Sequence, residues 1–161
     1  MKKTISLLLL FLIIGIQAQE KTLINKGEIT IPIGKKIILK PLLEGDKIVN
    51  LEIVKEENIT DKIDLMSTLK TFKKDNTTDN SIEFSFSEAK MMDHSLFALI
   101  TVQKTAKLMT FKAKIRLKGS SLYTSTSIMP VPSNANSVEE WRDTIDSIFL
   151  YDFKLGDEFK K

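Results

Sequence analysis

The chain has no cysteine and only one histidine, His94. Without thiols it can form no disulfide, offer no thiolate nucleophile and carry no lipid on a cysteine after an apolar leader. A single histidine without cysteine also leaves too few ligands for a typical zinc site. The stability of the protein must come from a packed core, and we predict that it uses no metal and no other cofactor.

Long hydrophobic runs are also absent, except at the N-terminus. Residues 5–16 form an apolar stretch of twelve residues, which is shorter than the roughly 20 that a membrane-spanning helix needs. Lys2 and Lys3 precede this stretch, and Ala18 follows it at a position suited to cleavage. We predict that residues 1–18 are a cleaved signal peptide, with a retained anchor as the alternative. The mature protein would then be periplasmic or extracellular, without a stable membrane anchor.

The chain has little excess charge of either sign. It contains 24 basic and 21 acidic residues, and loss of Lys2 and Lys3 with the signal peptide would leave 22 and 21. A net charge of +1 is no sign of an anionic polymer as partner, so we predict no nucleic-acid binding. Removing 18 residues from 161 leaves 143, enough for one domain over residues 19–161 but too few for two.

The clearest periodicity lies in residues 107–118, where apolar residues alternate with polar ones. This alternation predicts a strand with one buried and one solvent-facing side. Residues 95–103 are apolar on both sides, which predicts a strand at the centre of a sheet. Because residues 104–106 form a short polar link, the two strands are expected to pair as a hairpin.

Further strands are predicted by alternating apolar residues with glycine-containing turns between several of them. They cover residues 28–33, 36–43, 47–54, 82–86, 122–128 and 148–154. Together with the two strands above, this makes eight short predicted strands. Such a pattern favours an all-β antiparallel sandwich of immunoglobulin-like type, with about seven or eight strands. The chain lacks the cysteine and tryptophan pattern of true immunoglobulin domains, so the prediction concerns architecture alone.

Two stretches are predicted to be helical. Apolar residues recur at helical spacing from Ile59 to Leu69, after the possible N-caps Asn58, Thr60 and Asp61. Ser137 and Glu140 match a capping box, which predicts a second helix that ends near Asp146 and packs through Trp141. The polar residues 73–81 are expected to form an exposed loop.

Catalytic chemistry finds little support in the sequence. His94 adjoins Asp93, but neighbouring side chains rarely face each other, and the usual serine and zinc motifs are missing. Glu139 and Glu140 are adjacent and would point about 100° apart on a helix, so they cannot flank one bond. We predict that the protein is not an enzyme. A glycan or cell-wall hydrolase with carboxylates on separate strands is the alternative.

Residues 75–80 contain carboxylates and amides that could contact calcium. The segment does not fit the EF-hand pattern, because Asn80 stands at the glycine position and Phe86 at the position of the bidentate glutamate. A looser calcium site near Asp75 and Asp79 stays an alternative to an ordinary solvated loop.

Five residues are the candidate binding residues. Lys112, Lys114 and Arg116 would form a basic stripe on one strand face, while Tyr123 and Trp141 could supply aromatic contacts. The more ordinary interpretations are that the stripe keeps the sheet face soluble and that Trp141 anchors a helix to the sandwich. The hypothesis is a binding protein for an envelope or secreted protein, with a small-ligand, glycan or calcium-binding module as the alternative.

Overall fold

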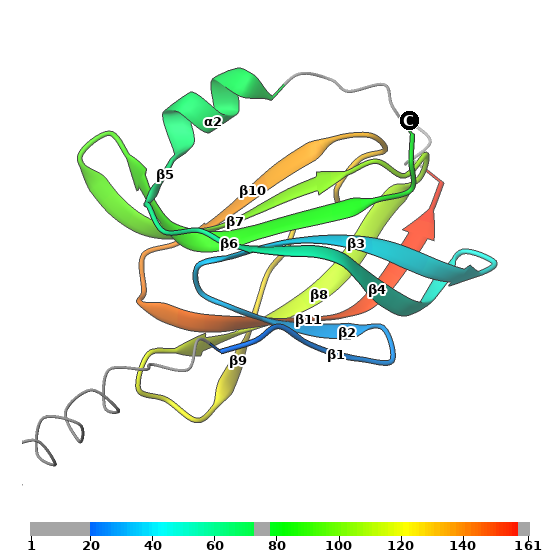
Figure 1. Ribbon diagram of the computed structural model, residues 1–161, viewed down its shortest axis with the longest axis horizontal. Helices are drawn as coiled ribbons and strands as arrows, with labels where there is room; N and C mark the ends of the chain where they lie inside the picture. The colour runs from blue at the N-terminus through cyan, green and yellow to red at the C-terminus, as the bar shows by residue number, and fades with distance from the viewer. Residues whose placement is uncertain (1–19, 73–77, 158–161) are drawn as a thin grey trace, which may run out of the picture.

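The computed structural model describes residues 20–72 and 78–157. This part of the chain is almost entirely β-structure, with eleven strands and one short helix (Figure 1). The predicted all-β, sandwich-like fold is confirmed, and the strands beyond the predicted number are short. The proposed signal peptide, residues 1–18, lies outside the described residues. Within the described residues, no helix has the length and hydrophobicity needed to cross a membrane.

One layer of the fold contains the strand pair that carries most of the predicted site. Its strands lie in the order β1, β2, β11, β8 and β9 (Figure 1). Their bounds are Leu23–Asn25 for β1, Glu28–Pro32 for β2, Ile145–Gly156 for β11, Leu108–Leu117 for β8 and Tyr123–Thr126 for β9. All these neighbours are antiparallel, as predicted.

The second layer continues from the first, because the end of β11 pairs with β4 at Lys154 and Lys47. Its strands lie in the order β4, β3, β6, β7 and β10. Their bounds are Lys47–Asn58 for β4, Lys35–Glu44 for β3, Ile82–Met91 for β6, His94–Gln103 for β7 and Asn136–Trp141 for β10. The short strand β5 (Ile63–Asp64) pairs in parallel with β6 and leads into the helix α2 (Leu65–Thr71).

The main core lies between the two layers. Phe84 from one layer contacts Phe111 edge-on at 5.6 Å and Phe153 at 6.1 Å between ring centroids, and Phe111 stacks on Phe153 at 5.2 Å. Isoleucine and leucine side chains from both layers, including the fully buried Ile29 and Leu39, surround these rings. Because the chain has no disulfides, burial of these alternating apolar side chains is the main source of its stability.

A smaller core lies on the opposite side of the second layer, under α2 (Figure 1). Leu65 of α2 packs there against Ala89, Leu96, Ala98 and Ile100. Strand β7 is therefore buried on both sides and pairs with both β6 and β10, so its predicted central position is confirmed. The helix begins later than predicted. Asp64 is its N-cap, and the carboxylate accepts a hydrogen bond of 3.1 Å from the backbone N–H of Ser67.

The predicted hairpin of residues 95–103 and 107–118 is wrong. Strand β7 pairs with β6 and β10, whereas β8 pairs with β11 and β9 in the other layer. The link between β7 and β8 is held by the buried side chain of Gln103. Its amide nitrogen donates to the backbone oxygens of Lys107 and Val131, each at 3.0 Å, and its oxygen accepts from the N–H of Thr105 at 3.2 Å. The short link therefore crosses between the layers and makes no turn within one.

The predicted helix from Ser137 to Asp146 is also wrong. Residues 136–141 form β10, which pairs with β7 from Asn136 opposite Val102 to Trp141 opposite Phe97. The Ser137 hydroxyl caps no helix and is buried without a hydrogen-bond partner among the described residues. Glu139 instead accepts a hydrogen bond of 2.8 Å from the N–H of Met129. Pairing with an exposed strand edge has overridden a capping pattern that is only local.

Candidate functional site

Four of the five candidate residues lie together on the outer surface of β8, β9 and β11. The register places Arg116 opposite Tyr123, Lys114 opposite Phe149 and Lys112 opposite Tyr151. Alternate residues of β8 and β11 point inward and are buried, as expected for strands with one wet side. We call this surface the aromatic–basic face and define it by Lys112, Lys114, Arg116, Tyr123, Phe149 and Tyr151.

The three rings of the aromatic–basic face form one row. Phe149 and Tyr151 stack nearly in parallel, with centroids 5.3 Å apart and 14° between ring planes. Tyr123 meets Phe149 at 6.1 Å and 64°. The Lys114 ammonium lies 5.4 Å from the centroid of Tyr151, and the Arg116 guanidinium 5.5 Å from that of Tyr123. A cation at this distance is attracted by the ring, so both ends of the row are held by cation–π contacts.

The charges of the face are largely neutralised within the protein. Arg116 pairs with Asp146 at 2.8 Å, and Lys112 pairs with Asp152 at 2.9 Å. Lys114 forms no ion pair with a carboxylate among the described residues. The basic stripe predicted from β8 alone is thus a mixed surface on which one cation, Lys114, stays available to a partner.

A buried hydroxyl holds the tyrosine at one end of the row. Ser147 is fully buried; its hydroxyl lies 2.9 Å from the Tyr123 hydroxyl and donates to Asp146 at 3.0 Å. The same Asp146 oxygen accepts from Arg116, so the four groups form a continuous network. Tyr123 and Arg116 are therefore held in place by hydrogen bonds within the protein.

The pKa of Asp152 is lowered, chiefly by its hydrogen bond from Lys112 and then by that from Lys154. We expect Lys112→Met to raise this pKa toward its ordinary value, and carboxyl ¹³C NMR over a pH titration measures it. The ion pair stabilises the fold at pH values above the pKa that Asp152 has in the unfolded chain. This stabilisation is lost as the pH falls through the lower pKa that Asp152 has in the folded protein. Lys114→Met is the control, and an unchanged Asp152 pKa in Lys112→Met would contradict the ion pair.

Trp141, the fifth candidate residue, lies in the other layer and not on the aromatic–basic face. Its indole N–H donates to the Thr126 hydroxyl at 2.9 Å. Thr126 is opposite Ala113, which places it on the inward side of β9. Trp141 therefore ties the end of β10 to β9, an anchoring role on a strand where a helix had been predicted.

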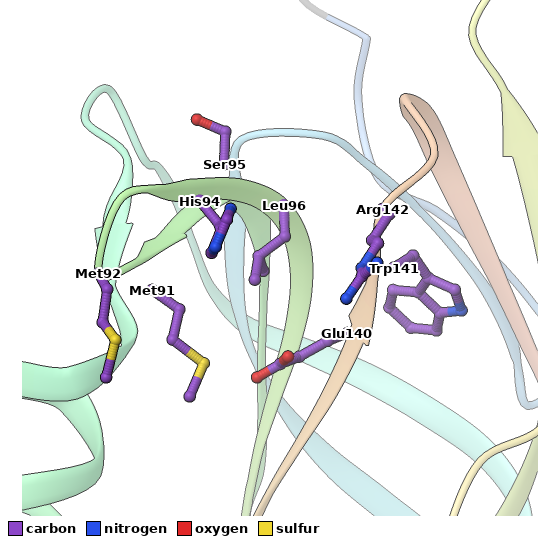
Figure 2. A pocket seen from close by; sticks show the side chains of 8 residues that line it. All are labelled: Met91, Met92, His94, Ser95, Leu96, Glu140, Trp141 and Arg142. Carbon is purple, nitrogen blue, oxygen red and sulfur yellow. The ribbon is translucent and has the colours of Figure 1, made fainter.

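Beside Trp141 lies a hollow of about 490 Å³ at the end of β10. Its lining comes from residues at and beside the β6–β7 turn and from residues at or just after the end of β10, among them Met91, His94, Leu96, Glu140 and Arg142 (Figure 2). Figure 2 shows the Glu140 and Arg142 side chains on one side of the β10 ribbon and the Trp141 ring on the other. The hollow combines apolar and charged side chains from two strands.

His94 opens β7 and is exposed, and it does not form a hydrolytic triad with the neighbouring serine. The Ser95 hydroxyl accepts a hydrogen bond of 3.2 Å from Lys62, and its side chain points away from His94 in Figure 2. Asp75 of the proposed calcium loop lies outside the described residues, and Asp79 accepts from the N–H of Ser81 at 2.9 Å. The described residues contain no group of three metal-binding side chains.

Phe149 and Tyr151 belong to the face but are not among the five candidate binding residues. Phe149 and Tyr151 alternate with the buried Ile148 and Leu150, which marks the two aromatic residues as outward-facing on β11. This signal could have identified an exposed aromatic pair. It could not have placed that pair beside β8, because alternation does not reveal which strands are neighbours.

No protein-family model, curated protein or solved structure matches this chain. The chemistry that the protein offers to a partner or ligand lies in the aromatic–basic face and in the hollow.

Proposed function

We propose that the protein is an exported binding protein whose aromatic–basic face contacts a protein of the bacterial envelope or a secreted protein, without a cofactor. The observation that carries this proposal is the row of Tyr123, Phe149 and Tyr151 between Lys114 and Arg116 on an outward sheet surface. Export is proposed from residues 1–18 alone.

The composition of the face supports a protein partner. Tyrosine and arginine are enriched at the centres of protein interfaces, where rigid side chains give contact area at low entropy cost. The three rings are half-buried, and the network through Ser147 holds Tyr123 in position. A partner would gain contact area without paying to order these side chains.

The arrangement of the rings favours a protein over a glycan. Sugar stacking needs an open ring face, whereas Phe149 and Tyr151 cover one face of each other and Lys114 lies over Tyr151. The ion pairs of Lys112 and Arg116 also argue against a highly anionic partner, since most of the positive charge is already matched. The expected partner surface is mixed, with one acidic group near Lys114.

The hydrolase alternative finds less support among the shifted carboxyl groups. The pKa values of Glu57, Asp64, Asp79 and Asp152 are all lowered, by hydrogen bonds from lysine, serine or backbone groups. A general acid in glycan cleavage needs a raised pKa. These groups lack the property that the reaction requires.

An affinity capture experiment tests the proposed function. The protein, expressed as the full chain, is immobilised and exposed to envelope extract and culture supernatant. We expect one stoichiometric protein partner, and the double variant Lys114→Glu, Tyr151→Ala to weaken its binding by about tenfold or more. This variant spares the ion pairs of Lys112 and Arg116, so it leaves the charge network of the face intact.

The matched control is the double variant Lys40→Glu, Leu42→Ala, which makes the same charge change at exposed positions of β3 in the other layer. It should bind the partner as the unmodified protein does. Equal loss of binding in both variants, or no protein captured by the unmodified chain, would contradict the proposed function. Thermal unfolding of each variant shows whether it is folded.

A further inference from the structure

The hollow at the end of β10 has an apolar floor and a charged rim. Met91 and Leu96, from the β6–β7 hairpin, supply apolar side chains, and Leu96 is buried while Met91 is half-buried. Glu140 and Arg142 lie at the rim and are exposed. Figure 2 shows the side chains of Glu140, Met91 and Leu96 converging on one space, with Arg142 above Glu140. A cavity of about 490 Å³ is within the usual size range of small-ligand sites.

The two rim charges are free to bind a ligand. Glu140 is near the end of β10 and Arg142 directly follows the strand, and Figure 2 shows both side chains on the same side of the chain. Neither side chain forms an ion pair or a hydrogen bond with any described residue. The carboxylate and the guanidinium together carry no net charge, so they match a ligand that also bears both signs.

The turn beside the hollow adds an exposed apolar side chain. Met92 has a φ of 54° and is 75% exposed at the tip of the β6–β7 hairpin. Met92 is the first of the two loop residues between the paired Met91 and His94, and a positive φ at this position is usual in two-residue hairpin turns, so the turn itself accounts for the backbone conformation. The exposed apolar side chain of Met92 also lines the hollow, where a ligand could cover it.

We infer that this hollow binds a small zwitterion with an apolar side chain, which is the chemistry of a free apolar α-amino acid or a short apolar peptide. The ligand carboxylate would pair with Arg142, whose planar guanidinium suits carboxylates. The ligand ammonium would pair with Glu140. The apolar side chain would lie on Met91 and Leu96, and methionine adapts to side chains of different shape.

The mixed charge of the rim also sets the specificity. A simple carboxylic acid would bring its negative charge near Glu140, and a simple amine would bring its positive charge near Arg142. Either ligand loses one ion pair and gains one like-charge contact. The site lies in the layer opposite the aromatic–basic face. Ligand binding there is therefore independent of the proposed function and is tested separately from it.

Isothermal titration calorimetry on the protein, expressed as the full chain, tests the inference. The zwitterionic probes are L-leucine, L-methionine and the dipeptide Leu-Leu. The matched probes are N-acetyl-leucine, which lacks the ammonium, leucinamide, which lacks the carboxylate, and glycine, which lacks the apolar side chain. We expect the zwitterionic apolar probes to bind, and each matched probe to bind about tenfold more weakly or worse.

Two exposed substitutions locate the binding. Arg142→Gln should weaken leucine binding by about tenfold, and Glu140→Gln should do the same. Glu52→Gln, at an exposed position of β4, is the control and should bind as the unmodified protein does. Tighter binding of Leu-Leu than of leucine would support the inference and identify peptides as the source. Absence of binding by all three zwitterions at millimolar concentration, or equal binding of N-acetyl-leucine, would overturn it.

Discussion

Replacing Phe84 by alanine is expected to lower the free energy of unfolding by about 3 to 5 kcal/mol, the usual cost of removing a buried phenylalanine ring. Phe84 has no exposed surface, and its ring contacts Phe111 and Phe153 from the opposite layer. The substitution would leave a cavity between the layers. The chain has no disulfide that could offset the loss of stability. Urea unfolding followed by circular dichroism measures the change.

Leu122→Ala is the control for this prediction, because Leu122 is 75% exposed and its loss should change the stability by less than about 0.5 kcal/mol. A loss below about 1 kcal/mol in Phe84→Ala would mean that the ring is not at the centre of a packed core. The described arrangement of the two layers would then be incorrect.

Replacing Gln103 by leucine is expected to cost about 3 kcal/mol, because it removes the partners of several buried backbone groups at once. The Gln103 amide bonds the carbonyl oxygens of Lys107 and Val131 and the N–H of Thr105. Gln103 and Val131 are both fully buried or nearly so, so water cannot readily replace these bonds. The same urea unfolding experiment applies.

Asn50→Leu serves as the control, since it makes a similar change from amide to hydrocarbon at an exposed position of β4. Its effect should stay within about 0.5 kcal/mol. If Gln103→Leu proved as stable as the unmodified protein, the side chain could not be what holds the crossing between β7 and β8.

The strands were predictable because their signal is local. Alternation in residues 107–118 indicated β8, and apolar residues on both sides of 95–103 indicated a central strand, now β7. Each pattern reports how many sides of a strand are buried, and burial of alternate side chains is a property of the strand itself. For the same reason the outward direction of Lys112, Lys114 and Arg116 could be predicted correctly.

The errors arose where a local signal competed with long-range pairing. The capping pattern at Ser137 is compatible with a helix, but β7 has a free edge that residues 136–141 complete. The link after Gln103 is short enough for a turn, yet the buried amide binds the backbone of the link itself at Lys107 and of the distant loop at Val131. The chain therefore passes from the second layer into the first. Neither the edge nor the loops can be recognised from nearby sequence.

The sequence by itself determined the absence of thiol chemistry, the all-β class and the solvent-facing side of the strands that alternation predicted, because composition and alternation are read within one segment. Only the tertiary structure decided that Phe149 and Tyr151 lie beside Lys114, and that aspartates of β11 neutralise the basic stripe. It also brought Glu140 and Arg142 to the β6–β7 turn. These outcomes depend on which strands pair across long stretches of chain, and that choice is made by burial of the whole core.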